Sequence, residues 1–300
     1  MTLIVIGGAT ASGKSALAVG LAHALEAEII NADSMQLYRG MDIGTAKLTS
    51  EEQEGIPHHL LSLVDVRTDV TVSWYQERAR AKVDELLAAG KHAIVVGGTG
   101  LYIKSLLDDL NFPDTNPEVR ARLEAEALAE GGLVLHNRLA VLDPAAALAI
   151  PVENVRRIVR ALEVIEITGK PYTANLPREG STKYPDAVHF AIESDRDKLD
   201  ERINLRVEKM WAEGFVEEVR DLVKAGILEG RTAQAAIGYS QIIAMAQGQI
   251  TEEVAKAATK VATRQYVRRQ DTWFRRDERI TWLPSEGNHV AAALGSIIKA

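Results

Sequence analysis

Short apolar runs alternate with longer amphipathic stretches over the first third of the chain. The runs are rich in Val and Ile and have the length of buried strands, whereas the stretches between them have helical spacing. We predict strands at residues 3–7, 28–32, 92–96 and 188–192, and helices at 14–26 and 73–89. This alternation predicts an α/β fold, in which helices flank a parallel sheet.

The middle of the chain follows a different pattern. After a cluster of breakers at residues 111–117, helical spacing continues without strand signals to about residue 170. An apolar stripe from Leu199 to Met210 then predicts a mostly helical remainder. We predict an all-helical domain inserted at residues 114–187, between two parts of the α/β core at 1–113 and 188–300.

The first apolar run leads into a glycine-rich loop. Its sequence fits the pattern G-x4-G-K-S between a strand and a helix, which predicts a phosphate-binding loop rather than an ordinary tight turn. Lys14 would reach the terminal phosphate, and the Ser15 hydroxyl would hold Mg²⁺. The loop leaves open whether the phosphates belong to ATP, GTP or another diphosphate. The predicted phosphate-binding residues are Gly8, Ala9, Thr10, Ala11, Ser12, Gly13, Lys14 and Ser15.

An acidic residue follows the second predicted strand. Asp33 would lie at the carboxyl edge of the sheet, where open α/β sheets bind ligands, and Thr10 and Thr99 would reach the same edge. In a kinase such a carboxylate handles Mg²⁺ or a hydroxyl acceptor, but it can equally take a proton from an amine. The plain alternative is that Asp33 caps the next helix.

Composition narrows the class of protein only slightly. With 46% apolar residues in 300, the chain can bury a sizeable core, and it has no cysteine for a disulfide or a thiolate metal site. The first apolar run is too short for a signal peptide or a membrane span, so we expect a cytoplasmic protein.

The distribution of charge matters more than its sum of −7. Residues 264–279 contain six arginines and three acidic residues, a balance of +3, with Tyr266, Trp273 and Phe274 among them. This mixture suits contact with an RNA backbone and stacking on unpaired bases, although a solvated helix with aromatic anchors has the same composition. Arg156, Arg157 and Arg160 form a second basic cluster on one helix.

Several longer motifs occur in a fixed order along the chain. They are Asp33-Ser34-Met35-Gln36-Leu37-Tyr38-Arg39, Pro57-His58-His59-Leu60, Gly97-Gly98-Thr99-Gly100-Leu101-Tyr102, Asn154-Val155-Arg156-Arg157, Ile237-Gly238-Tyr239 and Arg268-Arg269-Gln270-Asp271-Thr272-Trp273-Phe274-Arg275. Together with the phosphate loop they resemble the tRNA dimethylallyltransferase family over nearly the whole chain. Ala9 and Ser240 depart from that pattern, which usually has proline and a basic residue there.

The resemblance implies a P-loop NTPase-like fold and a specific reaction. A dimethylallyl group would pass from dimethylallyl diphosphate to the exocyclic amine of the adenine on the 3′ side of the tRNA anticodon (position 37), with release of pyrophosphate. Asp33 would remove the proton from the amine, Thr10 and Thr99 would position the substrates, and Lys14 with Arg202 or Arg206 would stabilise pyrophosphate. Mg²⁺ would bind at Ser15.

The resemblance also implies that the partner is a tRNA anticodon stem-loop, with no membrane and no obligate protein partner. The residues expected to contact tRNA are Asp33, Ser34, Met35, Gln36, Thr99, Arg120, Arg156, Arg157, Arg160, Gly238, Tyr239, Arg268, Arg269 and Arg275.

Two other functions are compatible with the loop. A P-loop kinase of a small nucleoside or metabolite would use the same loop on ATP, but it has no need of the basic segment at 264–279. A non-catalytic RNA-binding protein would use the loop only as an anion site. For Arg202 and Arg206, pattern alone favours a solvated helix face, and His58 and His59 lack the partners of a metal site.

Overall fold

The structure is a computed structural model that describes residues 1–175 and 182–298. The chain divides into two compact units, Met1–Leu107 with Tyr184–Ala300, and Asp108–Lys183. None of the helices in the described ranges is both long and apolar enough to cross a membrane.

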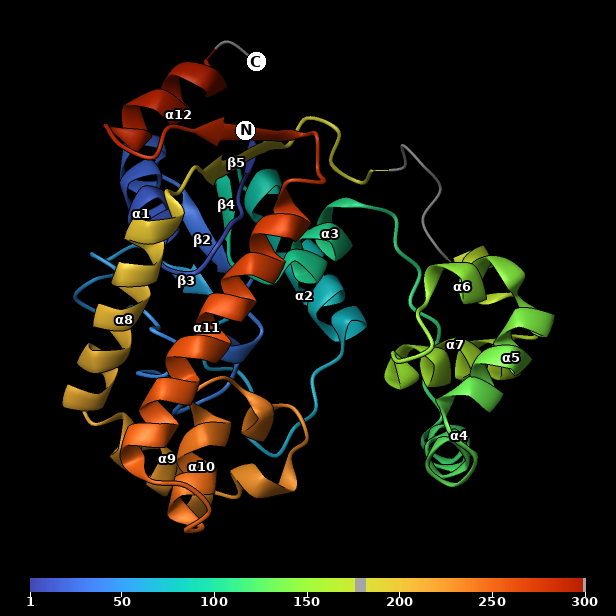
Figure 1. Cartoon of the computed structure of the whole chain (residues 1–300). Coiled ribbons are helices and arrows are strands. Elements are labelled where there is room, and N and C mark those ends of the chain that lie inside the picture. Colours follow the sequence, from blue (N-terminus) through green and yellow to red (C-terminus); the bar gives the residue numbers. More distant parts are fainter. Residues whose placement is uncertain (176–181, 299–300) are drawn as a thin grey trace. The chain divides into compact units, whose positions relative to one another are not determined.

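A six-stranded parallel sheet forms the centre of the first unit (Figure 1). Its strands lie in the order β3 (His58–His59), β2 (Glu28–Asn31), β4 (Ala93–Val96), β1 (Leu3–Ile6), β5 (Val188–Ile192) and β6 (Ile280–Leu283). The predicted α/β fold with a parallel sheet is confirmed. The sequence pattern missed β3, which is too short to show a period, and β6, which follows a charged turn in a region predicted to be mostly helical.

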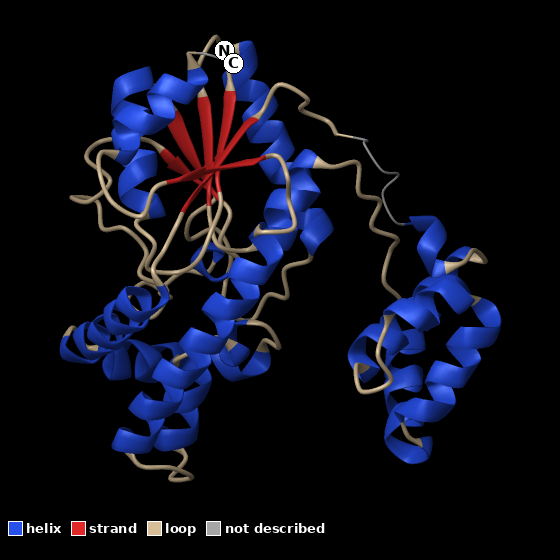
Figure 2. Ribbon diagram, turned by 45° about the horizontal axis from the view of Figure 1, so that its top comes forward, coloured by secondary structure: helices blue, strands red, loops and turns tan. Residues whose placement is uncertain are grey.

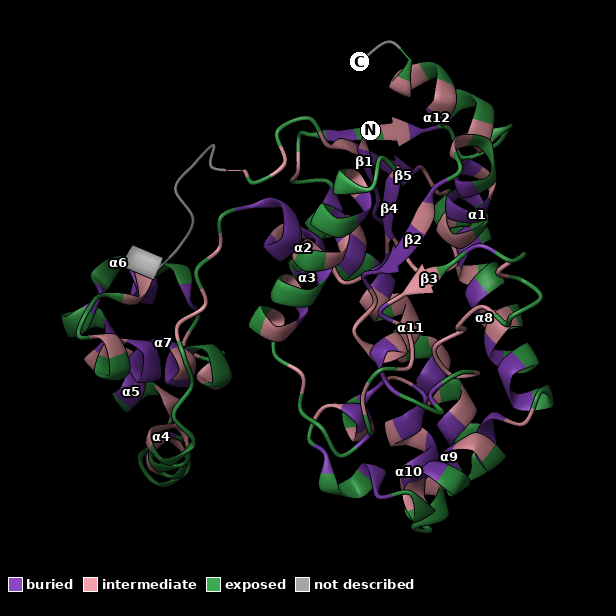
Figure 3. Cartoon of the chain, turned by 180° about the vertical axis from the view of Figure 1, so that it is seen from behind, coloured by how far each residue is buried: buried purple, intermediate pink, exposed green. Residues whose placement is uncertain are grey.

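Side chains alternate between the two faces of the sheet, as the period of a strand requires. Leu3 and Val5 of β1 pack with α2 (Val72–Ala88) and α3 (Gly100–Leu107), whereas Ile4 and Ile6 pack with α1 (Lys14–Leu25) and α12 (His289–Ile297). Figure 2 shows helices on both sides of the sheet, and Figure 3 shows that the central strands are buried. Both faces are covered, which explains the continuous apolar runs of these strands.

A helical cluster lies beyond the sheet in the same unit. It contains α8 (Arg196–Ala212), α9 (Phe215–Lys224), α10 (Tyr239–Ala246) and α11 (Glu252–Phe274), with the short helices η3 (Ile227–Glu229) and η4 (Ala233–Ala235). In Figure 1, α8 and α11 run from beside the sheet to α9 and α10. Phe215, Tyr239 and Tyr38 are fully buried in this cluster. Because α11 reaches back to the sheet, this helix connects the helical cluster with the sheet.

The secondary structure described for the second unit consists of helices and one isolated β-bridge, between Asp108 and Thr182. It contains α4 (Pro117–Glu130), α5 (Gly132–Leu142), α6 (Pro144–Ala149), α7 (Val155–Thr168) and η2 (Tyr172–Asn175). Local sequence fixes the helix starts, because Asn116, Asp143 and Asn154 each accept a backbone N–H of the following turn. Leu135 and Leu139 of α5 pack against Ile158 and Leu162 of α7 in a separate core.

Candidate active site

The glycine-rich loop joins the end of β1 to the start of α1. Gly8, Ala11 and Gly13 have positive φ values of 134°, 65° and 92°, a conformation that turns successive backbone N–H groups to one side. Gly13 at the start of α1 offers no side-chain cap, and the first turn of this helix has no acidic residue. Ser12 is buried, and its Oγ has no hydrogen-bond partner within the described residues. The loop therefore presents unsatisfied donors and the positive end of a helix.

Lys14 lies across this loop. Its Nζ donates a hydrogen bond to the Ala9 carbonyl oxygen at 3.0 Å. Burial lowers the pKa of Lys14 to about 8, with opposing contributions from Asp33, which raises it, and Arg206, which lowers it further. Burial removes the water that stabilises the ammonium charge, so a bound anion stabilises this lysine more than it would an exposed one.

Asp33 lies two residues beyond the end of β2 and is partly buried. Its backbone N–H donates to Asn31 Oδ1 at 2.9 Å, and its own Oδ1 accepts the Met35 N–H at 3.0 Å. Asp33 therefore satisfies the first N–H of η1 (Met35–Leu37) from the position before Ser34, which is the N-cap residue and makes no side-chain cap hydrogen bond. The plain alternative placed the N-cap one residue too early. It also lines two pockets, so capping does not account for its whole environment.

Two neighbouring loops converge near Asp33. Thr99 Oγ1, after β4, accepts the backbone N–H of Ser34 at 3.1 Å. Burial, together with the nearby charge of Asp33, raises the pKa of Tyr266 of α11 to about 12, and the neighbouring side chains of Thr99 and Gln270 partly oppose this shift. Tyr266 was not among the candidate site residues, because only its aromatic character was visible in the sequence.

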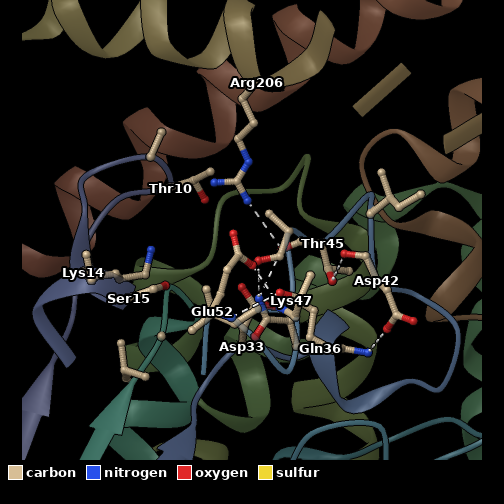
Figure 4. A pocket seen from close by; sticks show the side chains of 18 of the residues that line it. Thr10, Lys14, Ser15, Asp33, Gln36, Asp42, Thr45, Lys47, Glu52 and Arg206 are labelled. Atoms are coloured by element: carbon tan, nitrogen blue, oxygen red, sulfur yellow. Dashed lines mark hydrogen bonds and ion pairs between the residues drawn. The ribbon is translucent and has the colours of Figure 1, made fainter. Parts of the chain in front are cut away.

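Two adjoining pockets meet at Asp33, as Figure 4 shows for the larger one. The larger, of about 660 Å³, is polar at the loop and is lined by Thr10, Lys14, Ser15, Asp33, Gln36 and Arg206. The smaller, of about 310 Å³, shares Thr10, Asp33 and Arg206 but has the apolar walls Ile203, Val207, Phe215 and Ala236. A ligand with an anionic end and an apolar end matches this division.

The structure distinguishes the two candidate arginines of α8. Arg206 lines both pockets, and its Nη2 donates to the Thr45 carbonyl oxygen at 3.5 Å. Burial lowers the pKa of Arg206, and the carboxylate of Asp33 partly opposes this shift. Arg202 is exposed, and its charge acts on Lys198 and Glu286 instead.

Glu218 of α9 holds the loop at residues 42–44, which lies across the larger pocket from the phosphate loop (Figure 4). Its carboxylate accepts the backbone N–H groups of Asp42, Ile43 and Gly44, at 3.1, 2.6 and 3.2 Å. It also accepts the hydroxyl of Tyr239 at 2.6 Å. Burial and Glu218 raise the pKa of Tyr239 above its usual range.

The candidate tRNA residues near the cleft have varied surroundings. Met35 lines the smaller pocket and Gln36 lines the larger one, and Gln36 Nε2 donates to the Thr45 carbonyl oxygen at 3.1 Å. The Gly238 N–H donates to Gln241 at 2.7 Å at the start of α10. Tyr239 is fully buried, with its hydroxyl bound to Glu218, so it faces the smaller pocket from within the core.

The arginines of α11 also differ in their contacts. Arg268 and Arg269 are exposed, and the Arg269 guanidinium lies 5.7 Å from the centre of the Tyr266 ring. Arg275 is paired with Glu193 at 2.9 Å and with Asp271 at 3.0 Å, and it lies over the Trp282 ring. Arg268 and Arg269 are therefore freer to meet an RNA backbone than Arg275.

In the second unit, buried Glu163 organises two of the four candidate arginines. Arg120 and Arg160 pair with it at 2.6 and 2.8 Å, which lowers the pKa of Glu163 against the opposing effect of burial. Arg156 and Arg157 are exposed on α7.

The two neighbouring histidines have structural partners. His59 Nε2 contacts Glu28 at 2.6 Å, and His58 Nδ1 contacts the Ile56 carbonyl oxygen at 2.8 Å. In the described part of the chain, no group of three or more His, Asp or Glu side chains is arranged to hold a metal ion.

Comparison with known proteins identifies the family. The family model of IPP transferase matches residues 36–277. The chain is 57% identical to a tRNA dimethylallyltransferase of Streptomyces griseus over 94% of this chain and 89% of that protein. It is also 57% identical to one of Thermobifida fusca, over 94% of this chain and 90% of that protein.

Solved structures agree with this assignment. A tRNA isopentenylpyrophosphate transferase of Bacillus halodurans superposes with a TM-score of 0.71 at 37% identity, covering 99% of this chain and 98% of that one. A eukaryotic dimethylallyltransferase described as acting on tRNA superposes with a TM-score of 0.80 at 27% identity, over 95% of this chain and 74% of that one. The resemblance predicted from the sequence motifs is confirmed, and the chain belongs to the IPP transferase family.

Proposed function

We propose that this chain transfers a dimethylallyl group from dimethylallyl diphosphate to the exocyclic amine of the adenine on the 3′ side of the tRNA anticodon. The observation that carries the proposal is the meeting of a phosphate loop pocket and an apolar-walled pocket at one carboxylate, Asp33. The relatives named as tRNA dimethylallyltransferases support the same reaction. Because its substrate is tRNA, we place the enzyme in the cytoplasm.

The diphosphate would occupy the larger pocket. The loop N–H groups and the start of α1 favour an anion, and Lys14 and Arg206 add two positive charges. These groups would stabilise the charge that develops on pyrophosphate as the allylic C–O bond breaks. The dimethylallyl group would lie toward Ile203, Val207 and Phe215 in the smaller pocket.

The residues at the loop fit a bound Mg²⁺ only in part. Ser15 supplies one oxygen at the start of α1, and the Asp33 carboxylate lines the same pocket. Magnesium binds with few protein ligands when substrate phosphates and water complete its shell, which suits this sparse donor set. When bound, Mg²⁺ would neutralise charge on the leaving pyrophosphate.

Asp33 would act as the general base. As the new C–N bond forms, the amine loses a proton, and the Asp33 carboxylate would accept it. The oxygen that does not cap η1 is available for this role. Thr10 and Thr99 would position the reacting groups on either side. An adenine stacked in the anticodon loop cannot reach this pocket, so the base would be flipped out.

The tRNA would bind along the exposed basic residues. Arg269 of α11 lines the smaller pocket with Ser34 and Met35, Gln36 lines the larger one, and Arg268 is exposed next to Arg269. We also propose that Arg156 and Arg157 of the second unit contact the stem-loop, with Arg120 and Arg160 shaping that surface through Glu163.

Incubation with labelled dimethylallyl diphosphate or labelled ATP and unmodified tRNA tests the proposal. We expect label from the allylic donor in the modified adenine, seen by mass spectrometry of digested tRNA. The alternative kinase predicts transfer of phosphate from ATP to a small acceptor instead. Transfer from ATP without prenyl transfer would overturn the proposal.

An Asp33→Asn variant tests the general base separately. The amide oxygen can still accept the Met35 N–H, so the cap of η1 survives while the base is removed. Loss of a general base typically slows the chemical step by about 10²- to 10⁴-fold. A single-turnover rate close to that of the wild type would reduce Asp33 to a capping residue.

A further inference from the structure

A glutamine of α11 joins two loops of the candidate active site. Gln270 is buried, with 4% of its surface exposed. Its Oε1 accepts the backbone N–H of Thr10 at 2.9 Å, and its Nε2 donates to the carbonyl oxygen of Gly98 at 2.9 Å. We propose that Gln270 is a positioning residue that holds Thr10 and Thr99 at a fixed separation around Asp33. This inference rests on the proposed prenyl transfer.

The connection begins at the phosphate loop. The N–H of Thr10 is committed to Gln270, so this residue of the loop is anchored to α11 rather than to a ligand. Thr10 lines both pockets. A displacement of its backbone would therefore move a wall that both substrates share.

The other end of the connection reaches the loop after β4. Gly98 immediately precedes Thr99, whose Oγ1 accepts the N–H of Ser34, next to Asp33 in the chain. The strands β1 and β4 are neighbours in the sheet, and each leads into one of the two loops. Gln270 links these loops from a helix that packs over both.

The fit of the amide is specific. Thr10 offers a donor and Gly98 offers an acceptor, so the oxygen and nitrogen of Gln270 have only one arrangement that satisfies both. Gly98 has no space for a side chain, because a Cβ there would collide with Gln270 Nε2. Tyr266, one turn earlier on α11, lies close enough to the side chains of Gln270 and Thr99 for both to influence its pKa. The contact therefore requires glycine at one end and glutamine at the other.

The expected consequence is kinetic. A misplacement of about 1 Å in a reacting geometry can cost about 10²-fold in rate. A residue that served only to stabilise the fold would instead lower the melting temperature without changing the rate of the folded enzyme. The single-turnover rate at saturating tRNA and dimethylallyl diphosphate separates these two roles.

A double-mutant cycle provides the test. Gln270→Met keeps the length of the side chain but loses both hydrogen bonds, and Gly98→Ala pushes the amide away. We expect each change to slow the single-turnover rate by about 10- to 100-fold, and the double variant to be no slower than the slower single one, since both break the same link. Exposed Gln265 on the same helix gives the matched control, Gln265→Ala.

Thermal melting and a tRNA dissociation constant are measured for every variant. If Gln270→Met does not fold, Gln270→Glu replaces it, because that side chain keeps the acceptor for Thr10 and loses the donor to Gly98. Three outcomes would overturn the proposal. The folded variants could react at the wild-type rate, the two changes could act independently in the double variant, or the defect could be confined to tRNA affinity. Failure of the proposed function would instead appear as absence of transfer by the wild-type enzyme.

Discussion

The pKa of Lys14 makes diphosphate binding depend on pH. In the free site burial lowers this pKa to about 8, so the ammonium is lost as the pH rises through that value. A bound diphosphate places negative charge beside the ammonium and raises its pKa again. Binding above pH 8 must therefore take up a proton, and the affinity falls as the pH increases.

The size of the effect follows from the free-site value. If the bound form stays protonated, the dissociation constant is proportional to one plus the ratio of neutral to charged lysine. With a pKa of about 8, this factor increases roughly tenfold between about pH 7 and pH 9, equivalent to about 1.4 kcal/mol. Without the shift, lysine would stay charged over the same range.

Titration calorimetry with dimethylallyl diphosphate measures this change. Experiments in buffers of different ionisation enthalpy also count the protons taken up. Lys14→Arg is the matched control, because guanidinium stays charged over this range and the ligand's own ionisation is identical. If that variant binds too weakly, Lys14→Met, which has no charge to lose, serves the same purpose.

The comparison between wild type and control decides the argument. We expect the ratio of their affinities to change about tenfold over the two pH units. Parallel pH profiles for wild type and both variants would refute the reasoning that Lys14 is the titrating group.

Three further mutational experiments probe other parts of the site. Arg206→Ala should weaken diphosphate binding by about 10- to 100-fold in calorimetry, as expected when a charged hydrogen bond is removed. Arg202→Ala should change this affinity little. Equal effects of the two substitutions would contradict the assignment of Arg206, rather than Arg202, to the diphosphate site. The double substitution Arg268→Ala and Arg269→Ala should reduce the salt dependence of tRNA binding. The slope of log K against log salt should fall by about one unit for each phosphate that is no longer neutralised. An unchanged slope in a folded protein would argue against α11 as an RNA-binding element. Glu218→Ala should lower the free energy of unfolding, measured in urea, by about 2 kcal/mol, because three backbone N–H groups lose the carboxylate to which they donate. A change below about 0.5 kcal/mol would count against a role of Glu218 in holding this loop.

Local sequence determined much of this protein. The apolar runs and the loop from Gly8 to Ser15 predicted the parallel sheet and the phosphate site, because strand length, glycine spacing and the start of a helix are local properties. The family followed from the order of the motifs. Asp33 was also identified locally, together with the alternative that it is a helix N-cap. In the structure the N-cap is Ser34, while Asp33 accepts the first N–H of η1 and lines the pockets.

Tertiary structure decided which of several equivalent residues enter the site. Arg202 and Arg206 carry the same charge and lie one turn apart on the same face of α8. Only the fold shows that the pockets lie against the part of α8 from Ile203 onward, so that of the two it is Arg206 that lines them while Arg202 is exposed. Gln270 gave no signal of its own among its basic and aromatic neighbours. Its role arises because α11 packs over loops that are about 170 and 260 residues away in the chain. The amide of Gln270 makes a hydrogen bond of 2.9 Å to the backbone of each loop. Such contacts join distant segments through the folded core, and no local pattern encodes them.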